Sequence, residues 1–306
     1  MFTGKQLFMI KPLPLHKGDT IGLVAPARKI SKKELKSAVE IIESRGYRTL
    51  AEEHLFDSDG QFAGNDVSRT EDFREMILNP DINAILSVRG GYGSVRIVDL
   101  LPFVSLLTRP KWIVGYSDLT VFHNHINNIG VQTLHASMPI NFSTNTPEAL
   151  DSLFDVLEGK LPDYNFGNHV LNRPGKVRGM LVGGNLSVLC SLLGSASFPK
   201  TQNPILFLED LDEYLYHIDR MMMALKRSGF LRNISGLVVG AMTDMHDNTF
   251  PFGKTAEQII REAVEEYHFP VAFNFPAGHI SDNRALIMGG NVELESGASS
   301  KLTFSA

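Results

Sequence analysis

The chain has 306 residues, of which 43% are hydrophobic and 21% charged, and its formal net charge is -5 at pH 7. This composition is typical of a globular protein with a sizeable core, and the acidic balance excludes the basic surface by which nucleic acids are bound. The single cysteine, Cys190, excludes an internal disulfide framework, and the apolar block at residues 7–10 is too short for a signal peptide or a membrane span.

Strands and helices alternate through the first half of the chain. The expected strands cover residues 19–27, 49–55, 82–93, 111–118 and 131–138. The expected helices cover residues 31–47, 68–80, 93–101 and 118–128. Ser31 with Glu34, and Ser68 with Glu71, have the spacing of a capping box. Such alternation predicts βαβ units around a parallel sheet, so the fold class is α/β and the first half is a flavodoxin-like or related doubly wound domain.

The pattern loosens between residues 145 and 177, where Pro, Gly and Asn are frequent. We expect a domain boundary there, with one domain at residues 1–165 and the other at 166–306. The second half is predicted to hold helices at 214–230 and 255–267 and several short strands with glycines at their turns. It is expected to form a smaller β-rich domain, either a mixed, partly antiparallel sheet or a small barrel.

Ser117 is the main candidate for a catalytic nucleophile. It follows the apolar run Trp112 to Val114 and opens a segment with helical spacing that ends at Gly130. A hydroxyl at such a strand-to-helix turn lies at the carboxyl end of the sheet, where open α/β folds bind ligands. The alternative is that Ser117 only caps its helix.

The glycine-rich segment RGGYGS, residues 89–94, also joins a predicted strand to a predicted helix. Its spacing is not that of a dinucleotide-binding fingerprint, and a phosphate cradle is weakly supported. An N–H group of Gly90 or Gly91 could instead join that of Asp118 in an oxyanion hole. A tight turn would use the same glycines, and the GGN segment at residues 183–185 is equally ambiguous.

A serine nucleophile needs a base and an acid that orients the base. Among the ten histidines, His279 follows a Pro and a Gly in a predicted turn, which favours function. Glu209 ends the apolar strand ILFL, where a carboxylate is partly buried unless a polar group receives it. The competing acids are Asp210, Asp212 and Glu213. The competing histidines are His123 and His125, which face different sides of one helix, and His135, which could be a satisfied core residue.

No metal or cofactor is expected. Asp244, His246 and Asp247 lie on one turn, which cannot supply a closed metal site without distant ligands. Cys190 lies in the apolar run LSVLCSLLG and is read as a buried structural thiol.

Five blocks, in this order, resemble the LD-carboxypeptidases, a family of serine peptidases: VRGGYGSVRIVDLL, VGYSDLTVFHNHI, GMLVGGNLSVL, PILFLEDLDEYLYHIDRMMMAL and FPAGHISDNRAL. The resemblance spans nearly the whole chain. It implies that Ser117 is the nucleophile, Glu209 the acid and His279 the base, with the N–H groups of Asp118 and Gly91 as oxyanion donors. It also implies a flavodoxin-like N-terminal domain, a β-rich C-terminal domain of swivelling β/α or barrel-like type, an active site between them, and a homodimer.

Two comparisons limit this reading. The order Ser, Glu, His also occurs in α/β-hydrolases, but those enzymes use G-x-S-x-G, and here Leu119 stands where the second glycine would be. After His279, family members often have another glycine directly and a proline before the closing glycine, whereas this chain reads ISDNRALIMGG. That departure leaves the expected triad intact and puts the substrate in doubt.

The resemblance implies a cytoplasmic enzyme that removes the terminal D-alanine from a murein tetrapeptide. Arg89 is the candidate for the substrate carboxylate, with a salt bridge as its alternative role. Another candidate activity is cleavage of aminoacyl-nucleotide conjugates, as in microcin self-immunity, which would need an aromatic platform; Trp112, the one tryptophan, is poorly placed for it. A binding protein without catalysis is the third alternative.

Overall fold

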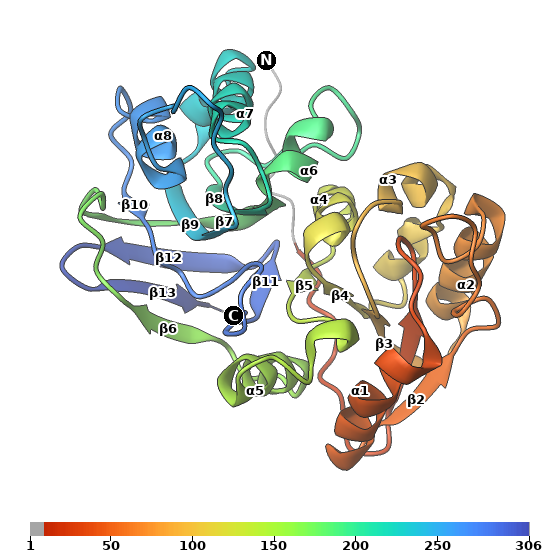
Figure 1. Ribbon diagram of the computed structural model, residues 1–306. Coiled ribbons are helices and arrows are strands. Elements are labelled where there is room, and N and C mark those ends of the chain that lie inside the picture. Colours follow the sequence, from red (N-terminus) through yellow and green to blue (C-terminus); the bar gives the residue numbers. More distant parts are fainter. Residues whose placement is uncertain (1–8, 306) are drawn as a thin grey trace, which may run out of the picture.

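The computed structural model describes residues 9–305, so the apolar block at residues 7–10 lies partly outside the described residues. Figure 1 shows two parts side by side, with the first half of the chain around one sheet and most of the second half around another. Of the described helices, none is long and apolar enough to cross a membrane.

The first sheet has six strands in the order β11-β5-β4-β3-β1-β2. Their bounds are β1 Thr20–Val24, β2 Arg48–Ala51, β3 Ile82–Ser87, β4 Trp112–Gly115, β5 Thr133–His135 and β11 Leu286–Met288. The first five are parallel in the order of a flavodoxin-like sheet, and β11 joins β5 in antiparallel pairing. The prediction of a parallel, flavodoxin-like first half is therefore confirmed.

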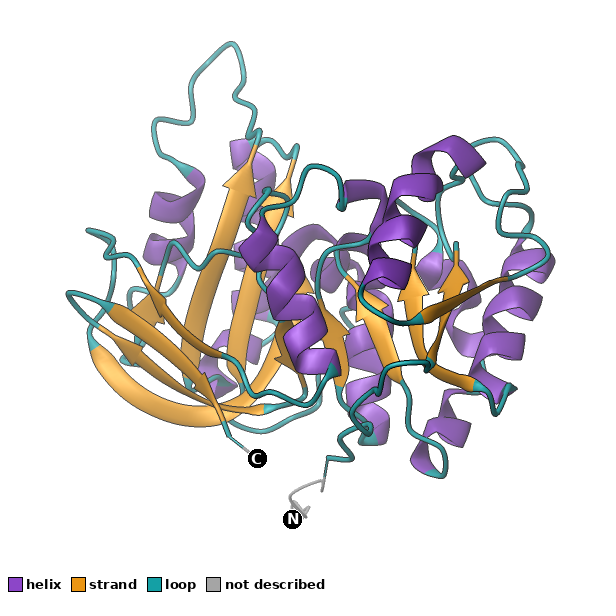
Figure 2. Cartoon of the chain, turned by 90° about the horizontal axis from the view of Figure 1, so that it is seen from below, coloured by secondary structure: helices purple, strands orange, loops and turns teal. Residues whose placement is uncertain are grey.

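Helices cover the strands of this sheet on more than one side (Figure 2). Their bounds are α1 Lys32–Ser44, α2 Asp66–Leu78, α3 Ser94–Ile97, α4 Thr120–Ile129 and α5 Pro147–Leu157. Short 3-10 helices lie between them: η1 Val98–Leu100, η2 Phe103–Leu107, η3 Ser117–Leu119 and η4 Pro139–Asn141. The helix predicted after the glycine-rich turn is thus only one α-helical turn, extended by η1.

One of the two expected capping boxes is present. Ser31 accepts the backbone N–H of Glu34, whose carboxylate accepts the N–H of Ser31 in return. The box expected at Ser68 is wrong, because α2 begins earlier: Asn65 is its N-cap and accepts the N–H of Ser68 at 2.9 Å. Asparagine is as good an N-cap as serine, so the helix starts at the first of two competent residues.

The second sheet is mixed and has seven strands in the order β10-β9-β8-β7-β12-β13-β6. Their bounds are β6 Asp163–Phe166, β7 Gly175–Asn185, β8 Ile205–Leu211, β9 Gly236–Thr243, β10 Val271–Ala272, β12 Asn291–Ser296 and β13 Ser300–Phe304. Four strands from β10 to β7 are parallel, and the remaining three pair antiparallel. The helices are α6 Leu186–Ser191, α7 Leu215–Arg227, α8 Ala256–Ala263 and the 3-10 helix η5 Phe230–Asn233. The expected mixed sheet is confirmed.

The two sheets share a core. One cluster of buried apolar side chains contains Leu23 and Trp112 from the first sheet together with Leu181 and Phe207 from the second. The chain also returns from the second half to the first sheet, because β11 forms an edge strand of that sheet beside β5. The expected boundary at residue 165 stays a prediction, and the shared core brings side chains of β4 and β8 into one cluster.

Candidate active site

Ser117 lies where the chain turns from β4 into α4. It is the first residue of η3, and its φ of 63° is a left-handed conformation that strains a serine by about 1–3 kcal/mol. Every other residue from Lys111 to Asn124 is buried, whereas Ser117 is partly exposed. Among residues 9–305 its side chain makes no capping hydrogen bond, so the alternative of a simple helix N-cap is wrong.

The glycine turn after β3 lies against this serine. A Cβ atom on Gly90 would come within 3.5 Å of the Ser117 Oγ, so a side chain there would crowd the hydroxyl. Gly91 follows with a φ of 112°. In the part of the chain that the structure describes, the N–H groups of Gly91 and Asp118 donate to no acceptor. Two free N–H groups beside a hydroxyl meet the first requirement of an oxyanion hole.

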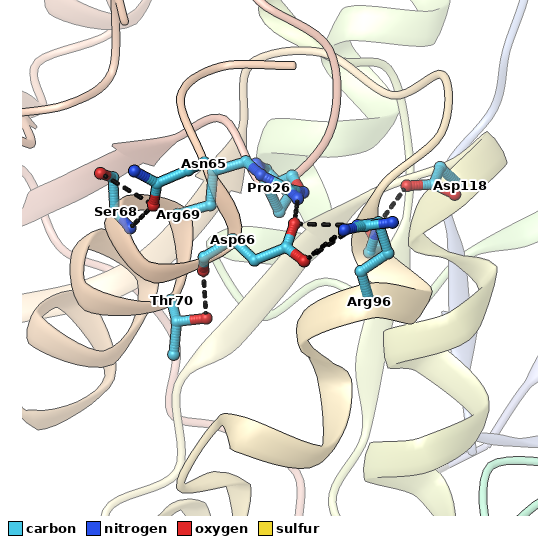
Figure 3. A network of polar contacts seen from close by, with 9 residues as sticks. Pro26, Asn65, Asp66, Ser68, Arg69, Thr70, Arg96 and Asp118 are labelled. Carbon is cyan, nitrogen blue, oxygen red and sulfur yellow. Dashed lines mark hydrogen bonds and ion pairs between the residues drawn. The ribbon is translucent and has the colours of Figure 1, made fainter. Parts of the chain in front are cut away.

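The side chain of Asp118 anchors the turn. Its Oδ2 accepts the backbone N–H of Ser94 at 2.8 Å (Figure 3). Burial raises the pKa of this carboxyl, while the Ser94 bond and the charge of Arg69 act in the opposite direction. Arg69 is itself buried and bonds the carbonyl oxygen of Pro26 and the carboxylate of Asp66. These contacts tie η3 to the start of α3 and to the loop after β1.

Glu209 and His279 form the second part of the site. Glu209 is fully buried in β8, at a point where the pairing register with β9 shifts, and its Oε2 lies 2.7 Å from His279 Nδ1. The side chain of His279 is 15% exposed. Burial alone would lower the pKa of His279, but the charge and hydrogen bond of Glu209 outweigh burial and raise it. A carboxylate in this position holds the imidazole with Nδ1 protonated and Nε2 free to accept a proton.

The residue before the histidine must be a glycine. Gly278 has a φ of 116°, and a Cβ atom there would lie 2.8 Å from the Oε2 of Glu209. A side chain would therefore displace the acid from the base. The signal for this requirement is visible in the sequence as the Pro-Ala-Gly-His turn, but its reason is not.

Tyr116 brings the two parts of the site together. Its ring centroid lies 4.9 Å from that of His279, and it directly precedes Ser117. Among the described residues no hydrogen bond joins Ser117 to His279. Catalytic hydrogen bonds are often long or misaligned without substrate and shorten when it binds, so the arrangement is compatible with a serine and its general base.

The GGN segment at residues 183–185 joins the two halves. Asn185 N–H donates to the Thr120 Oγ1 at 2.9 Å, and the carbonyl of Gly183 accepts the Nδ2 of Asn124 at 2.9 Å. A Cβ atom on Gly184 would lie 2.5 Å from the Thr120 Oγ1. These glycines therefore permit close approach to α4, and the segment ends β7 rather than forming a tight turn.

The competing acids point elsewhere. Asp210 is buried and accepts hydrogen bonds from the Nδ2 of Asn185 and the N–H of Ser187; burial and the neighbouring Glu209 raise its pKa to about 7. Asp212 lies 2.5 Å from His246, and Glu213 lies 2.5 Å from His217. Of these four acids, Glu209 alone contacts His279 within residues 9–305.

The competing histidines are not alike. His123 is buried, and its two ring nitrogens contact Thr133 and Gly115; His125 contacts Ser197. Burial lowers the pKa of His123 to about 4, so it is neutral near pH 7. His135 is also buried, but neither of its ring nitrogens has a hydrogen-bond partner in the described chain. His135 is thus a core residue, and the Asn283 side chain is a hydrogen-bonding group beside its ring.

Arg89 has the contacts of its alternative role. Its Nη1 lies 3.7 Å from the carboxylate of Glu34 and donates to the carbonyl of Lys29 at 3.2 Å. Sequence reasoning did not single out Arg28, whose side-chain stem packs over Gly91 and which has no ion-pair partner among the described residues.

No group of three or more His, Cys, Asp or Glu side chains in the described part of the chain could hold a metal ion. Trp112 is fully buried, so it offers no platform to a ligand. Exposed aromatic rings are instead found on Tyr214 and Tyr216, whose centroids lie 5.7 Å apart at the start of α7. Cys190 is largely buried, and burial raises the pKa of its thiol to about 12, which makes it a poor nucleophile.

Two family models match the chain. Residues 21–136 match the LD-carboxypeptidase N-terminal domain, and residues 178–294 match the LD-carboxypeptidase C-terminal domain. The first match contains Ser117 and the second contains Glu209 and His279.

Individual relatives agree with these models. A probable murein peptide carboxypeptidase of Bacillus subtilis is 34% identical over 91% of this chain and 89% of its own length. The microcin C7 self-immunity protein of Escherichia coli is 27% identical over 90% of each chain. The crystal structure of a muramoyltetrapeptide carboxypeptidase from Oxalobacter formigenes superposes with a TM-score of 0.87 at 27% identity, covering 94% of this chain and 99% of that one.

Proposed function

Because the chain belongs to the LD-carboxypeptidase family of serine peptidases, we propose that it removes the terminal D-alanine from murein tetrapeptides. The observation that carries the proposal is the contact of 2.7 Å between the buried Glu209 and His279, set beside the strained turn of Ser117. A buried acid, an imidazole and a partly exposed hydroxyl with free N–H groups are the parts that acyl transfer requires.

In the proposed reaction His279 Nε2 takes the proton of Ser117, and the serine Oγ attacks the carbonyl carbon of the bond before D-alanine. His279 then gives this proton to the departing amine, which leaves an ester on Ser117. A water molecule, deprotonated by His279, hydrolyses the ester and restores the hydroxyl. Glu209 keeps Nδ1 protonated and stabilises the cation in both steps.

The N–H groups of Gly91 and Asp118 are proposed to receive the negative oxygen of each tetrahedral intermediate. One such donor typically contributes about 3 kcal/mol to the transition state. The substrate's terminal carboxylate is proposed to meet Arg89, which would exchange a long contact of 3.7 Å with Glu34 and a hydrogen bond of 3.2 Å to the Lys29 carbonyl for it. Arg28 is a second guanidinium within the same region.

A second candidate activity, cleavage of aminoacyl-nucleotide conjugates, is favoured by one observation. Tyr214 and Tyr216 are 44% and 40% exposed and could stack an aromatic base. The acids beside them, Asp212 and Glu213, oppose the anionic linkage of such conjugates. We therefore place the murein peptide first.

Mass spectrometry of the purified protein with a murein tetrapeptide ending in D-alanine tests the proposal. We expect loss of one D-alanine with the unchanged protein and none with Ser117→Ala or His279→Ala. An intact tetrapeptide would remove this substrate and lead to aminoacyl-sulfamoyl nucleotides as the next assay. Cleavage by the Ser117→Ala variant would show that the assignment of the nucleophile is wrong.

The third alternative, binding without catalysis, has a separate test. A phosphonylating reagent should add one label to the unchanged protein and none to Ser117→Ala. The absence of labelling in both, together with tight binding of the tetrapeptide, would favour a binding protein.

The family resemblance further implies a cytosolic homodimer, and we include both properties in the proposal. Light scattering of the eluting protein should give twice the 33.9 kDa of one chain. Fractionation of the source cells should find the activity with the cytosol.

A further inference from the structure

The loop that carries the base is closed by a buried asparagine. Asn283 is fully buried, and its Oδ1 accepts the backbone N–H of Gly278 at 2.8 Å. This bond holds the Ala277–Gly278 peptide unit, and Gly278 directly precedes the His279 that carries the imidazole. The loop from residue 278 to residue 283 is thereby closed on itself just behind the contact between His279 and Glu209.

The same loop is attached to the first half of the chain. Ser281 accepts the N–H of Thr146 at 2.9 Å, and the Nδ2 of Asn145 donates to the same carbonyl oxygen at 2.9 Å. On the other side the Thr243 hydroxyl donates to the carbonyl oxygen of His279 at 3.2 Å. The position of the base therefore depends on contacts from both halves of the molecule.

Three polar groups behind the base lack partners. The Nδ2 of Asn283, both ring nitrogens of His135 and the Oε1 of Glu209 are buried without a hydrogen bond in the described part of the chain. Such atoms are rare in folded proteins, and a group of them beside a proposed catalytic contact calls for a functional explanation. Closure of the loop explains why the Oδ1 of Asn283 is buried, because that atom accepts the Gly278 N–H. It does not explain why the amide nitrogen of Asn283 is buried.

His135 can complement the amide of Asn283. Burial holds the pKa of His135 well below its usual range, and the nearby Asn283 side chain opposes that effect. The neutral ring has one acceptor nitrogen, and the amide has two donor hydrogens. His135 also lies near the base, because the Tyr116 ring contacts both imidazoles. The Tyr116 centroid lies 5.7 Å from the centroid of His135 and 4.9 Å from that of His279.

We propose that Asn283 is a positioning residue for the base: its Oδ1 fixes the Ala277–Gly278 peptide just before His279, and its amide group is oriented by His135 from the other sheet. The inference rests on the proposed function of His279. Asn283 does not touch the substrate; it acts by keeping the Nδ1–H of His279 on Glu209. It makes the geometry of the base depend on β5, a strand of the first sheet.

The main test compares Asn283→Ala with Asn145→Ala, which removes another tether of the same loop without touching the Gly278 N–H. For Asn283→Ala we expect kcat to fall at least about tenfold with KM changed less than about twofold, because the substrate contacts remain. The acidic limb of the profile of kcat/KM against pH should move to lower pH, since the contact with Glu209 raises the pKa of His279. Asn145→Ala should leave that profile unchanged.

The ionisable groups around His279 are Glu209 and Asp210 from β8, His135 from β5, and Tyr116 after β4. Burial raises the pKa of Tyr116 to above its usual range and that of His135 is lowered, so neither changes charge near pH 7. Asp210, with a pKa of about 7, is present equally in both variants and cannot produce a difference between them.

A spectroscopic measurement makes the test independent of activity. The Nδ1 proton of His279 should give a low-field proton NMR signal in the unchanged protein that is weakened or lost in Asn283→Ala. Asn283→Asp, which retains an oxygen acceptor for the Gly278 N–H, should recover part of the signal and of kcat. If the unchanged protein cleaves no peptide, the proposed function fails while this signal still tests the inference.

A double-mutant cycle tests the part of His135. His135→Phe should lower kcat, as Asn283→Ala does. The fold-decrease in kcat of the double variant should be smaller than the product of the two single fold-decreases. Independent effects would overturn the link to β5. An unchanged pH profile together with an unchanged Nδ1 signal in Asn283→Ala would overturn the positioning role. If the variants do not fold, hydrogen exchange of the Gly278 amide is measured in the unchanged protein. Fast exchange there would also overturn the positioning role, because it would mean that the bond to Asn283 does not hold.

Discussion

The buried carboxylate of Glu209 determines the protonation of His279, the proposed base. A fully buried charge is unfavourable unless it is paired, and the His279 imidazole is its one hydrogen-bonded partner within residues 9–305. The pair favours the protonated ring, so the pKa of His279 lies above its ordinary value although burial acts against it. A base must be neutral to accept a proton. The activity should therefore be lost, as pH falls, at a higher pH than an isolated histidine would give.

Glu209→Gln tests this relation. The amide carries no charge, so the pKa of His279 should fall and the acidic limb of kcat/KM should move to lower pH. The amide can also hold the wrong tautomer of the ring, so kcat should fall by about 10³- to 10⁴-fold, as in other serine triads that lose their acid. Steady-state kinetics across pH measures both effects.

Asp210→Asn is the matched control for that variant. It removes the adjacent carboxylate, whose charge contributes less to the pKa of His279 than that of Glu209 and which bonds Asn185 rather than the ring. Its shift of the acidic limb should be the smaller of the two. An equal or larger shift would mean that Glu209 is not the acid.

At the scale of the elements, the chain places its chemistry at the ends of strands. Ser117 lies two residues after the end of β4 and Glu209 lies near the end of β8, and both strands are parallel members of their sheets. At the carboxyl ends of parallel strands, side chains and unpaired N–H groups are accessible because the chain leaves the sheet there. The short η3 turn then allows Ser117 the left-handed backbone that exposes its hydroxyl.

Helix α2 provides a prediction at this scale, because its start was misassigned from sequence. Asn65→Ala should lower the free energy of unfolding by about 1 kcal/mol, since the N–H of Ser68 loses its acceptor at the helix end. Ser68→Ala should change it by less than about 0.5 kcal/mol. Urea denaturation followed by circular dichroism compares them. A larger loss of unfolding free energy for Ser68→Ala than for Asn65→Ala would support Ser68 as the cap of α2 instead.

At the scale of the whole molecule, the geometry of the candidate active site depends on how α4 meets β7. Asn124 is buried and receives the N–H of Gly183 at 3.2 Å while donating to its carbonyl oxygen at 2.9 Å. This pair of bonds connects the helix after Ser117 with the strand beside Glu209. Together with the bond from the Asn185 N–H to the Thr120 Oγ1 at 2.9 Å, it joins α4 to β7 by polar contacts.

Asn124→Ala should therefore lower the free energy of unfolding by about 3 kcal/mol, because it leaves two buried backbone groups of Gly183 without partners. The midpoint of urea denaturation measures the loss. Asn233→Ala removes an exposed amide that bonds the carbonyl of Gly229, and it should change the midpoint little. Equal effects would show that the pairing with Gly183 is not what holds the halves together.

Much of the fold followed from local patterns. Continuous apolar runs such as Ile205–Leu208 predicted buried strands, and the 3.6-residue period after Ser31 predicted α1, because burial of one face depends on nearby side chains alone. Two competent caps within one turn, Asn65 and Ser68, could not be ranked from sequence. The pairing of β11 with β5 was not predicted, because it joins segments far apart in the chain.

By itself the sequence determined the residue types of the site and the turns that carry them: a serine after an apolar strand, a histidine after a glycine, and acids at the end of a buried run. Only the tertiary structure decided which acid meets the base. Adjacent residues of a strand point to opposite faces, so Glu209 and Asp210 have equal local signals and different partners. The face that His279 approaches is set by the packing of the two sheets, and so are the unpartnered atoms of Asn283 and His135 behind it.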